Sequence, residues 1–260
     1  MSDAASPLPS PVELSEMPLE TRNEILLNAL REGVFDYLDF GTHKGGGLDW
    51  GLSLGGRRGL GVELNDEKVL HALRSGYYVL SYDVFKIPID EAPIVDFAVC
   101  RHVLEHMPNI HVVALIIERL RKFVRHYIYI EQPDFSQERY LAGLGLKLQG
   151  SYLKGHACPM ETRDLIEIFW DVGFDNFVVG GIRRCWGSDS RYIHRADVAP
   201  RTVGKWREGD LPKPSVKFDR PIFRDIIAVL GKESEIDTLG IAKLCKMEEV
   251  FLQSRVRLYG

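Results

Sequence analysis

Short apolar runs alternate along the first 180 residues with segments whose apolar residues recur at helical spacing. The apolar runs are VFDYLDF, RGLGVEL, YYVLSYD, IVDFAVC and HYIYIEQP. Between them lie helical patterns of about 10 to 15 residues, including TRNEILLNALREG, NDEKVLHALRSG and NIHVVALIIERLRKF. Strands that are separated by helices predict βαβ units and a parallel sheet.

The predicted fold class is α/β, a doubly wound Rossmann-like sheet with helices on both faces. The continuous apolar character of IVDFAVC and HYIYI agrees with this, because parallel strands are covered on both faces. A helix through ETRDLIEIFWDVG and a strand at FDNFVVGGI follow. A partner strand near SRYIHRADV is expected to complete a terminal antiparallel hairpin.

Four parts are expected along the chain. Residues 1–18, rich in Pro and Ser, are predicted to be a flexible leader, and 19–199 the main domain. Residues 200–220 have the composition of a linker or arm. Residues 221–260 are predicted to be a helical extension that could pack on the core, cover the site or form a homodimer; the pattern leaves these open.

Composition narrows the possible partners. The chain has 260 residues, 45% of them apolar and 27% charged, as in an ordinary globular protein. A net charge of −4 gives no electrostatic footprint for nucleic acid or an anionic membrane. No window approaches the roughly 20 apolar residues of a membrane span, and the first residues lack the pattern of a signal peptide. The expectation is a soluble, cytoplasmic protein.

The cysteines agree with a reduced compartment. Cys100, Cys158, Cys185 and Cys245 are scattered and never spaced as CxxC. This spacing predicts neither a zinc site nor a disulfide framework.

The stretch YLDFGTHKGGGLDWG carries the first chemical signal. The predicted strand ends at Asp39, and Gly41, Gly45 and Gly46 follow before the next helix. Glycines at such a turn let backbone amides approach a ligand at the carboxyl end of a parallel sheet. The GxGxxG pattern of a dinucleotide site is absent. Because a carboxylate before the turn would repel a phosphate, Asp39 suits a cationic ligand.

Two more acids end the next two predicted strands. Glu63 in GVEL can accept hydrogen bonds from both hydroxyls of a ribose. Asp83 in YDVFKIP stands beside Val84 and Phe85, an arrangement that suits the amino edge and the face of adenine. Three acids at three successive strand ends therefore predict a site for a cationic adenosine compound.

The motifs LDFGTHKGGG, GVELN, YDVFKIP, VDFAVCRHVLEHM and HYIYIEQP together resemble, over residues 20–182, the class I S-adenosylmethionine-dependent methyltransferases. The VLEHM step resembles the small-molecule methyltransferases related to the quinone-biosynthesis O-methyltransferases. The resemblance implies a seven-stranded sheet whose last strand is antiparallel, and S-adenosylmethionine as the cofactor. It implies these cofactor-binding residues: Asp39, Gly41, Thr42, His43, Gly45, Gly46, Glu63, Leu64, Asp83, Val84, Arg101 and His102.

The resemblance also assigns roles and contains one departure. It places Gly41 and Gly45 along the methionine part of the cofactor, Asp39 near its amino group, Glu63 at the ribose, and Asp83 at the adenine. The family often has a glycine where this chain has His43. The methionine end is therefore held differently, or His43 reaches the substrate side.

Three histidines are candidate catalytic residues, because a hydroxyl acceptor needs a base and histidine titrates near neutral pH. His102 and His106 follow the fourth strand, four residues apart, and would share a face if this segment is helical. Glu105 could then orient one of them. His156 lies in the loop that borders the acceptor pocket in methyltransferases of this type. Structural roles for all three remain open. A metal site made of Glu105 and two histidines is conceivable, but it is not predicted because no fourth ligand is indicated.

The predicted function is S-adenosylmethionine-dependent methylation, at oxygen, of a small molecule or a glycan precursor. One alternative is a methyltransferase-fold module that binds the cofactor without catalysis. Another is a nicotinamide oxidoreductase, which Asp39 and the missing GxGxxG disfavour.

Overall fold

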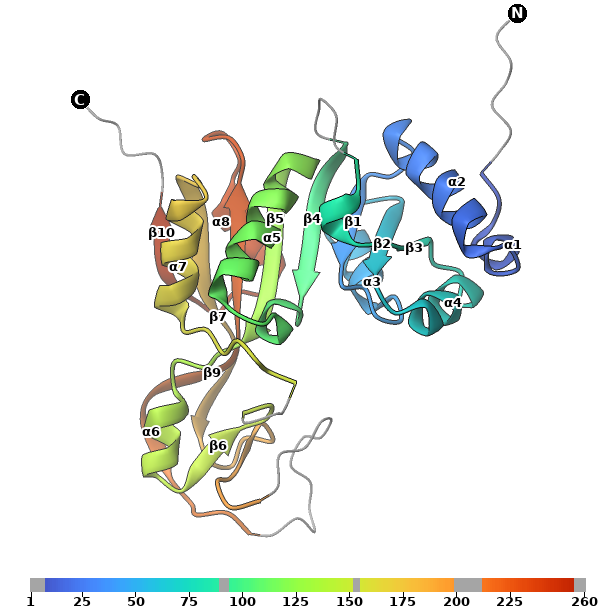
Figure 1. Cartoon of the computed structure of the whole chain (residues 1–260). Helices are drawn as coiled ribbons and strands as arrows, with labels where there is room; N and C mark the ends of the chain where they lie inside the picture. Colours follow the sequence, from blue (N-terminus) through green and yellow to red (C-terminus); the bar gives the residue numbers. More distant parts are fainter. Residues whose placement is uncertain (1–7, 89–93, 152–154, 199–211, 255–260) are drawn as a thin grey trace, which may run out of the picture. The chain divides into compact units, whose positions relative to one another are not determined.

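A computed structural model describes residues 8–88, 94–151, 155–198 and 212–254 of the chain (Figure 1). Its contacts divide the chain into two compact units. Unit 1 consists of Met1–Arg101 and Glu118–Tyr129, and unit 2 consists of His102–Ile117 and Ile130–Gly260. The domain boundaries expected at residues 19, 199 and 220 remain predictions.

Unit 1 contains the βαβ series that the sequence predicts. Its elements are α1 (Pro11–Ser15), α2 (Leu19–Arg31), β1 (Tyr37–Phe40), α3 (Gly46–Ser53), β2 (Gly59–Glu63), α4 (Asp66–Arg74), β3 (Val79–Ser81), η1 (Val84–Lys86) and β4 (Val95–Arg101). With β5 (Val124–Pro133), the strand order is β5-β4-β1-β2-β3. Strand β1 is parallel to β2 and β4, and β2 is parallel to β3.

Local signals in the sequence set the ends of these elements. Asn65 caps α4 by accepting a hydrogen bond from the Lys68 amide at 3.1 Å. The chain leaves the same helix through Gly76, whose φ of +92° favours glycine. Helix α3 packs against β1, β2 and β4. The carboxyl ends of β1, β2 and β3 thus lie at one edge of a parallel sheet, where ligands bind in open α/β folds.

The predicted flexible leader is wrong in its second half. Residues 1–7 lie outside the described residues, but Pro11–Ser15 form helix α1, which packs against α4. Ser10 and Glu13 cap this helix reciprocally, and Leu14 is fully buried. Helix α2 begins at Leu19, after Pro18 at its N-cap.

Unit 2 begins after β4. Its elements are η2 (Leu104–His106), α5 (Ile110–Phe123), β5 (Val124–Pro133), α6 (Glu138–Gly143), β6 (Leu146–Leu148), α7 (Thr162–Asp171), β7 (Asn176–Gly187), β8 (Ile193–Arg195), β9 (Lys217–Gly231), α8 (Thr238–Leu244) and β10 (Glu249–Ser254). Residues of α5 and β5 belong to both units. The strand order in unit 2 is β10-β7-β9-β5, with β7 antiparallel to β9 and β10.

The mostly parallel α/β sheet with flanking helices confirms the predicted fold class, with eight strands in place of seven. The additional strands come from the C-terminal segment, for which the helical prediction is wrong. FRDIIAVLGK lies in β9, and only Thr238–Leu244 of the described tail is helical. Residues 225–231 are all buried, and such a run favours a strand that is covered on both faces.

The predicted terminal hairpin is also different. Strand β8, from SRYIHRADV, pairs with β6, while the partners of β7 are β9 and β10. The two short strands cover a small cluster of buried apolar residues that includes Leu146, Cys185 and Ile193. The proposed homodimer through C-terminal helices has only the seven-residue α8 as a helical surface in the described part.

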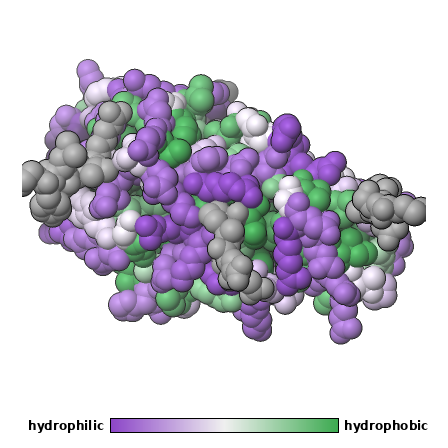
Figure 2. Space-filling view, turned by 90° about the horizontal axis from the view of Figure 1, so that it is seen from above, coloured by the Kyte–Doolittle hydropathy of each residue, from purple (hydrophilic) through white to green (hydrophobic). Residues whose placement is uncertain are grey.

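Residues 200–211 of the predicted linker lie outside the described residues, and its last four residues belong to β9. Among the helices that the structure describes, none combines the length and apolar composition that a membrane crossing requires. On the face seen in Figure 2, hydrophilic side chains are interspersed with smaller hydrophobic groups.

Candidate active site

Asp39 lies in β1 with its side chain directed at the first turn of α3. It is 1% exposed. A Cβ on Gly47 would come within 2.1 Å of Asp39 Oδ1, so only a glycine leaves room for the carboxylate. The other oxygen, Oδ2, is buried and has no hydrogen-bond partner among the described residues. A buried acceptor without a partner is costly unless a ligand supplies one.

The electrostatics of Asp39 follow from this burial. Loss of solvation raises the pKa of the Asp39 carboxyl to about 7, while the Thr42 hydroxyl and the charge of Arg101 act to lower it. The nearby Glu63 charge raises it further. Asp39 is therefore a carboxylate whose ionised form a cationic ligand would stabilise.

The turn after β1 connects to Glu63 through the backbone. The amide of His43 donates to Glu63 Oε2 at 3.1 Å, and the amides of Leu64 and Asn65 donate to Oε1 at 2.9 and 3.0 Å. Three amides thus fix the carboxylate at the end of β2, and Oε2 keeps a second lone pair for a ligand. His43 has a φ of +53°, a left-handed conformation that glycine favours. This explains why a glycine is usual at that position of the motif.

The third acid, Asp83, caps η1 by accepting a hydrogen bond from the Phe85 amide at 3.0 Å. The next residue, Val84, is buried, and Leu64 is 74% exposed. A cavity of about 570 Å³ borders this end of unit 1, between α2 and the segment after β3. Leu64 and Asp83 both line it, together with Asn23 of α2.

Two further candidate cofactor residues have structural contacts. Arg101, the last residue of β4, lies over the Trp50 ring of α3 at 4.5 Å from its centroid. Thr42 is buried, and its side chain fills the space beside Gly61, where a Cβ would clash. Its hydroxyl lies close enough to the Asp39 carboxylate to lower the pKa of that group, but neither this hydroxyl nor Asp39 Oδ2 makes a hydrogen bond of normal geometry to a residue that the structure describes.

Unit 1 thus gathers the candidate cofactor residues along the ends of β1 to β4, apart from His102, which belongs to unit 2. They fit S-adenosylmethionine. The unpaired oxygen of Asp39 suits an ammonium group, and the Glu63 carboxylate suits a ribose. Asp83 and the cavity beside it suit an adenine. These assignments remain predictions.

In unit 2, His102 lies between two buried carboxylates. Its Nδ1 is 3.5 Å from Glu105 Oε1, and its Nε2 is 3.4 Å from Glu131 Oε1. Burial lowers the pKa of His102, but hydrogen bonds to Glu105 and Glu131 and the charge of Asp225 outweigh it and raise the pKa to about 9. His102 is therefore protonated at neutral pH and cannot be a general base there. Its φ of +53° also excludes the helical turn that would place it beside His106.

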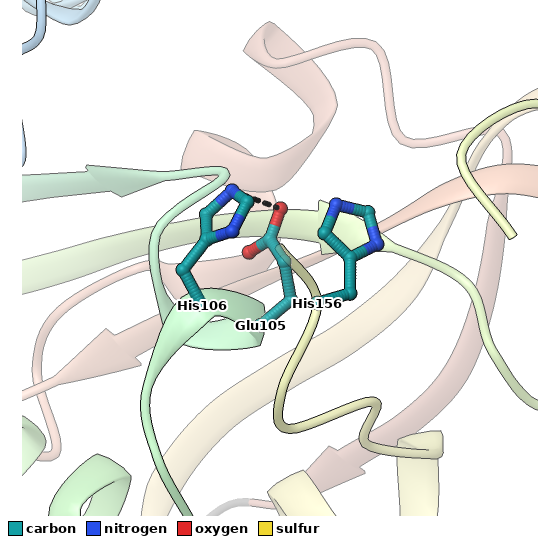
Figure 3. Close-up of side chains that lie close together, drawn as sticks. All are labelled: Glu105, His106 and His156. Carbon is teal, nitrogen blue, oxygen red and sulfur yellow. Dashed lines mark ion pairs between the residues drawn. The ribbon is translucent and has the colours of Figure 1, made fainter. Parts of the chain in front are cut away.

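His106 and His156 instead lie together, on either side of Glu105 (Figure 3). Their ring centroids are 4.9 Å apart, and His106 Nε2 is 4.0 Å from Glu105 Oε1. Burial lowers the pKa of His156, and the charges of His106 and His102 lower it further against the opposite effect of Glu105. His156 is thus neutral at pH 7.

Sequence reasoning missed two residues of the His102 cluster. Arg183 Nη1 donates to Glu131 Oε1 at 2.8 Å and also to Asp225. Glu131 and Asp225 are fully buried. The signal was a charged residue inside an otherwise apolar strand, Arg183 in FVVGGIRRCWG and Asp225 in FRDIIAVLG. Cys158 is buried, which raises its pKa and argues against a nucleophilic thiolate.

A model of the methyltransferase domain family matches residues 14–178. A S-adenosylmethionine-dependent methyltransferase from Archaeoglobus fulgidus has a similar structure, with a TM-score of 0.52 and 16% identity over 80% of this chain and 94% of that one. A possible histamine N-methyltransferase from Thermotoga maritima has a TM-score of 0.48 and 13% identity, over 81% of this chain and 91% of that one. Magnesium protoporphyrin IX methyltransferase from Synechocystis has a TM-score of 0.42 and 14% identity, over 82% of each chain. No curated protein matches the sequence.

Proposed function

We propose that this chain, which belongs to the methyltransferase domain family, methylates an oxygen of a small molecule or a glycan precursor. The family model covers more than half of the chain, and the fold is that of S-adenosylmethionine-dependent methyltransferases. The chain is thus an S-adenosylmethionine-dependent enzyme. The nicotinamide alternative is set aside, since the family is a different one.

When bound, S-adenosylmethionine supplies a methyl group whose bond to the cationic sulfur breaks as the acceptor oxygen bonds to the carbon, leaving a neutral thioether. Unit 1 supplies the groups that hold it. Three backbone amides fix the Glu63 carboxylate for a ribose. Asp39 offers an unpaired, buried oxygen to an ammonium group. Holding the reacting atoms in line is the main contribution of a protein to such a displacement.

Oxygen is favoured as the acceptor by one observation in unit 2. Glu105 Oε2 and His156 Nδ1 are both buried and without hydrogen-bond partners among the described residues. A hydroxyl must lose its proton during methyl transfer, whereas a neutral amine already carries a free lone pair. Two unpartnered groups that can take a proton therefore suit a hydroxyl. His102, which is protonated at neutral pH, is better suited to orient Glu105 and Glu131 than to act as the base.

The partner and location follow from charge and cysteine chemistry. A net charge of −4 supports a small molecule or a glycan precursor over a nucleic acid. No disulfide joins any of the four cysteines, all of which the structure describes and buries. These features support a reducing compartment, the cytoplasm.

The test is a methyl-transfer screen with S-adenosylmethionine labelled in its methyl group. Phenols, sugars and other hydroxyl compounds form one panel, and matched primary amines form the other. We expect label in the hydroxyl panel, with a rate that falls by about 100-fold in His156→Ala, the scale for loss of a general base. Transfer to amines alone would overturn the oxygen assignment. His111→Ala, at an exposed histidine of α5, is the control.

A further inference from the structure

We infer that Glu105, His106 and His156 form a binding site for one divalent transition-metal ion, of which zinc is the best match. One ligand atom from each side chain lies within 4.8 Å of the other two. The binding of the ion is independent of the proposed function; its role in activating an acceptor hydroxyl rests on that function.

The three side chains converge although they come from separate segments. Glu105 and His106 belong to η2, and His156 follows β6 in the chain. Figure 3 shows the two imidazole rings flanking the carboxylate. Zinc binds nitrogen and carboxylate oxygen at about 2.0–2.2 Å, which brings its donors to roughly 3.5 Å from one another. His106 Nε2 and Glu105 Oε1, at 4.0 Å, are already close to that separation.

The proton on His106 is placed by the backbone. His106 Nδ1 is 2.6 Å from the carbonyl oxygen of Gly155. Because a carbonyl only accepts hydrogen bonds, Nδ1 must carry the proton and Nε2 the lone pair. The lone pair is thus on the nitrogen that lies nearer Glu105. Histidines that bind metals usually donate their other N–H in this way to a carbonyl or carboxylate.

Glu105 and His156 each have one buried atom without a hydrogen-bond partner. Glu105 is 1% exposed; its Oε1 faces His102 and His106, and its Oε2 makes no hydrogen bond to any residue that the structure describes. His156 Nδ1 is also buried and makes no hydrogen bond to a described residue. An unpaired carboxylate oxygen in the interior is costly, and a cation is the partner that compensates it most strongly.

Two hydrogen bonds hold the loop that carries His156 to η2. The Cys158 amide donates to the Glu105 carbonyl at 3.0 Å, and the Gly155 carbonyl accepts from His106. These contacts lie on both sides of His156 in the sequence. One backbone hydrogen bond and one from the His106 side chain therefore hold the segment around His156 next to Glu105 without the ion.

A second group of potential ligands is His102, Glu131 and Asp225. Its acids already have cationic partners, because Arg183 pairs with both of them and Arg224 pairs with Asp225. His102 donates toward two carboxylates and leaves no lone pair for an ion. This cluster is an ion-pair network without a free ligand atom on His102, whereas Glu105, which pairs with His102 through Oε1, keeps Oε2 without a partner among the described residues.

The donor set indicates the kind of ion. Two imidazole nitrogens with one carboxylate are typical of zinc and other late first-row ions, whereas magnesium and calcium prefer oxygen ligands. Three protein ligands leave a coordination position open, as in catalytic zinc sites. With the ion bound, the lone pairs of Glu105 and His156 are used for coordination, and the ion replaces them in activating the acceptor. A hydroxyl bound at the open position would lose its proton to solvent more readily, because a cation lowers the pKa of a bound hydroxyl group.

The experiment titrates zinc sulfate into the full chain, untagged and stripped of metal with EDTA, by calorimetry. Cobalt(II) absorption in the visible range gives a second readout that does not involve activity. We expect one ion per chain, and at least tenfold weaker binding in His156→Ala and Glu105→Gln. His111→Ala, the same change at an exposed histidine, should bind zinc like the wild type.

Circular dichroism confirms that each variant is folded. A folded wild type that does not bind zinc, or a His156→Ala variant that binds as tightly as the wild type, would overturn the inference. S-adenosylhomocysteine is titrated in parallel to separate the two proposals. Cofactor binding and oxygen methylation without zinc binding would refute only the metal site. Zinc binding with transfer to amines alone would support the site and refute the oxygen assignment.

Discussion

The Asp39 carboxylate fills the space that a side chain on Gly47 would need, with Oδ1 only 2.1 Å from the position of a Cβ there. The acid that ends β1 and the first turn of α3 are thus packed against each other. This contact fixes the turn between them, in which the candidate cofactor residues Gly41 to Gly46 lie. It also explains why the third of the three consecutive glycines, Gly47, has no side chain.

Replacement of Gly47 by alanine should destabilise the fold. The added methyl group meets a buried carboxylate, and such overpacking costs about 1–3 kcal/mol. Gly46→Ala is a matched control, since nothing lies within 4 Å of its Cβ position. Urea denaturation should show a lower free energy of unfolding for Gly47→Ala alone. Equal stability of the two variants would contradict the packing of Asp39 against α3.

The burial of Asp39 should also make stability depend on pH. Its pKa is about 7 in the folded chain and about 3.9 in the unfolded chain. At pH values between these two pKa values, the folded state binds more protons than the unfolded state. The contribution of Asp39 to stability therefore falls as pH rises. From pH 5.5 to 8 this loss amounts to about 2 kcal/mol, because each pH unit below the folded pKa is worth about 1.4 kcal/mol.

Asp39→Asn removes this titration. The free energy of unfolding of the variant relative to wild type should therefore increase by about 2 kcal/mol between pH 5.5 and pH 8. Urea denaturation at the two pH values measures the change. The same difference at both pH values would mean that the Asp39 pKa is not raised.

His43 should contribute through its backbone. Its φ of +53° costs a residue with a Cβ about 1–2 kcal/mol. His43→Gly should be at least as stable as wild type, and His43→Val less stable by about 1 kcal/mol, since a β-branched residue tolerates this conformation poorly. His43→Gly should keep its affinity for S-adenosylhomocysteine, because the amide that donates to Glu63 remains. A tenfold loss would show that the imidazole itself contacts the cofactor.

Arg183 should be important for stability. Its partners Glu131 and Asp225 are fully buried, and removal of one member of a buried ion pair costs about 3–5 kcal/mol. We expect a loss of this order in Arg183→Met, measured by urea denaturation. Arg163→Met is the control, because the Arg163 pair with Glu167 is exposed and worth less than about 1 kcal/mol. Similar losses in both variants would refute the role of the buried network.

The sequence predicted unit 1 well because its signals are local. The strands β1, β2 and β3 end within a few residues of Asp39, Glu63 and Asp83. Asn65 and Gly76 directly mark the two ends of helix α4. The departure at His43 was recognised from the motif, but its cause, the left-handed backbone, required the structure.

Unit 2 depends on contacts between distant parts of the chain. The apolar run in β9 is compatible with a buried helix or a buried strand, and pairing with β7 decides between them. His156 and Glu105 are far apart in the sequence, so their proximity could not be inferred from spacing. The same holds for Arg183 and Asp225, whose pairing bridges two strands.

The most direct test of the account is calorimetric titration of the full chain with S-adenosylhomocysteine, comparing wild type, Glu63→Ala and Glu67→Ala. Glu67 is an exposed acid in the first turn of α4 and is the control. We expect micromolar binding by wild type and Glu67→Ala, and weaker binding by Glu63→Ala by about 1.5–3 kcal/mol, the scale of hydrogen bonds to a charged group. No binding by the folded wild type, or unchanged binding by Glu63→Ala, would contradict the cofactor site at the ends of β1 to β3.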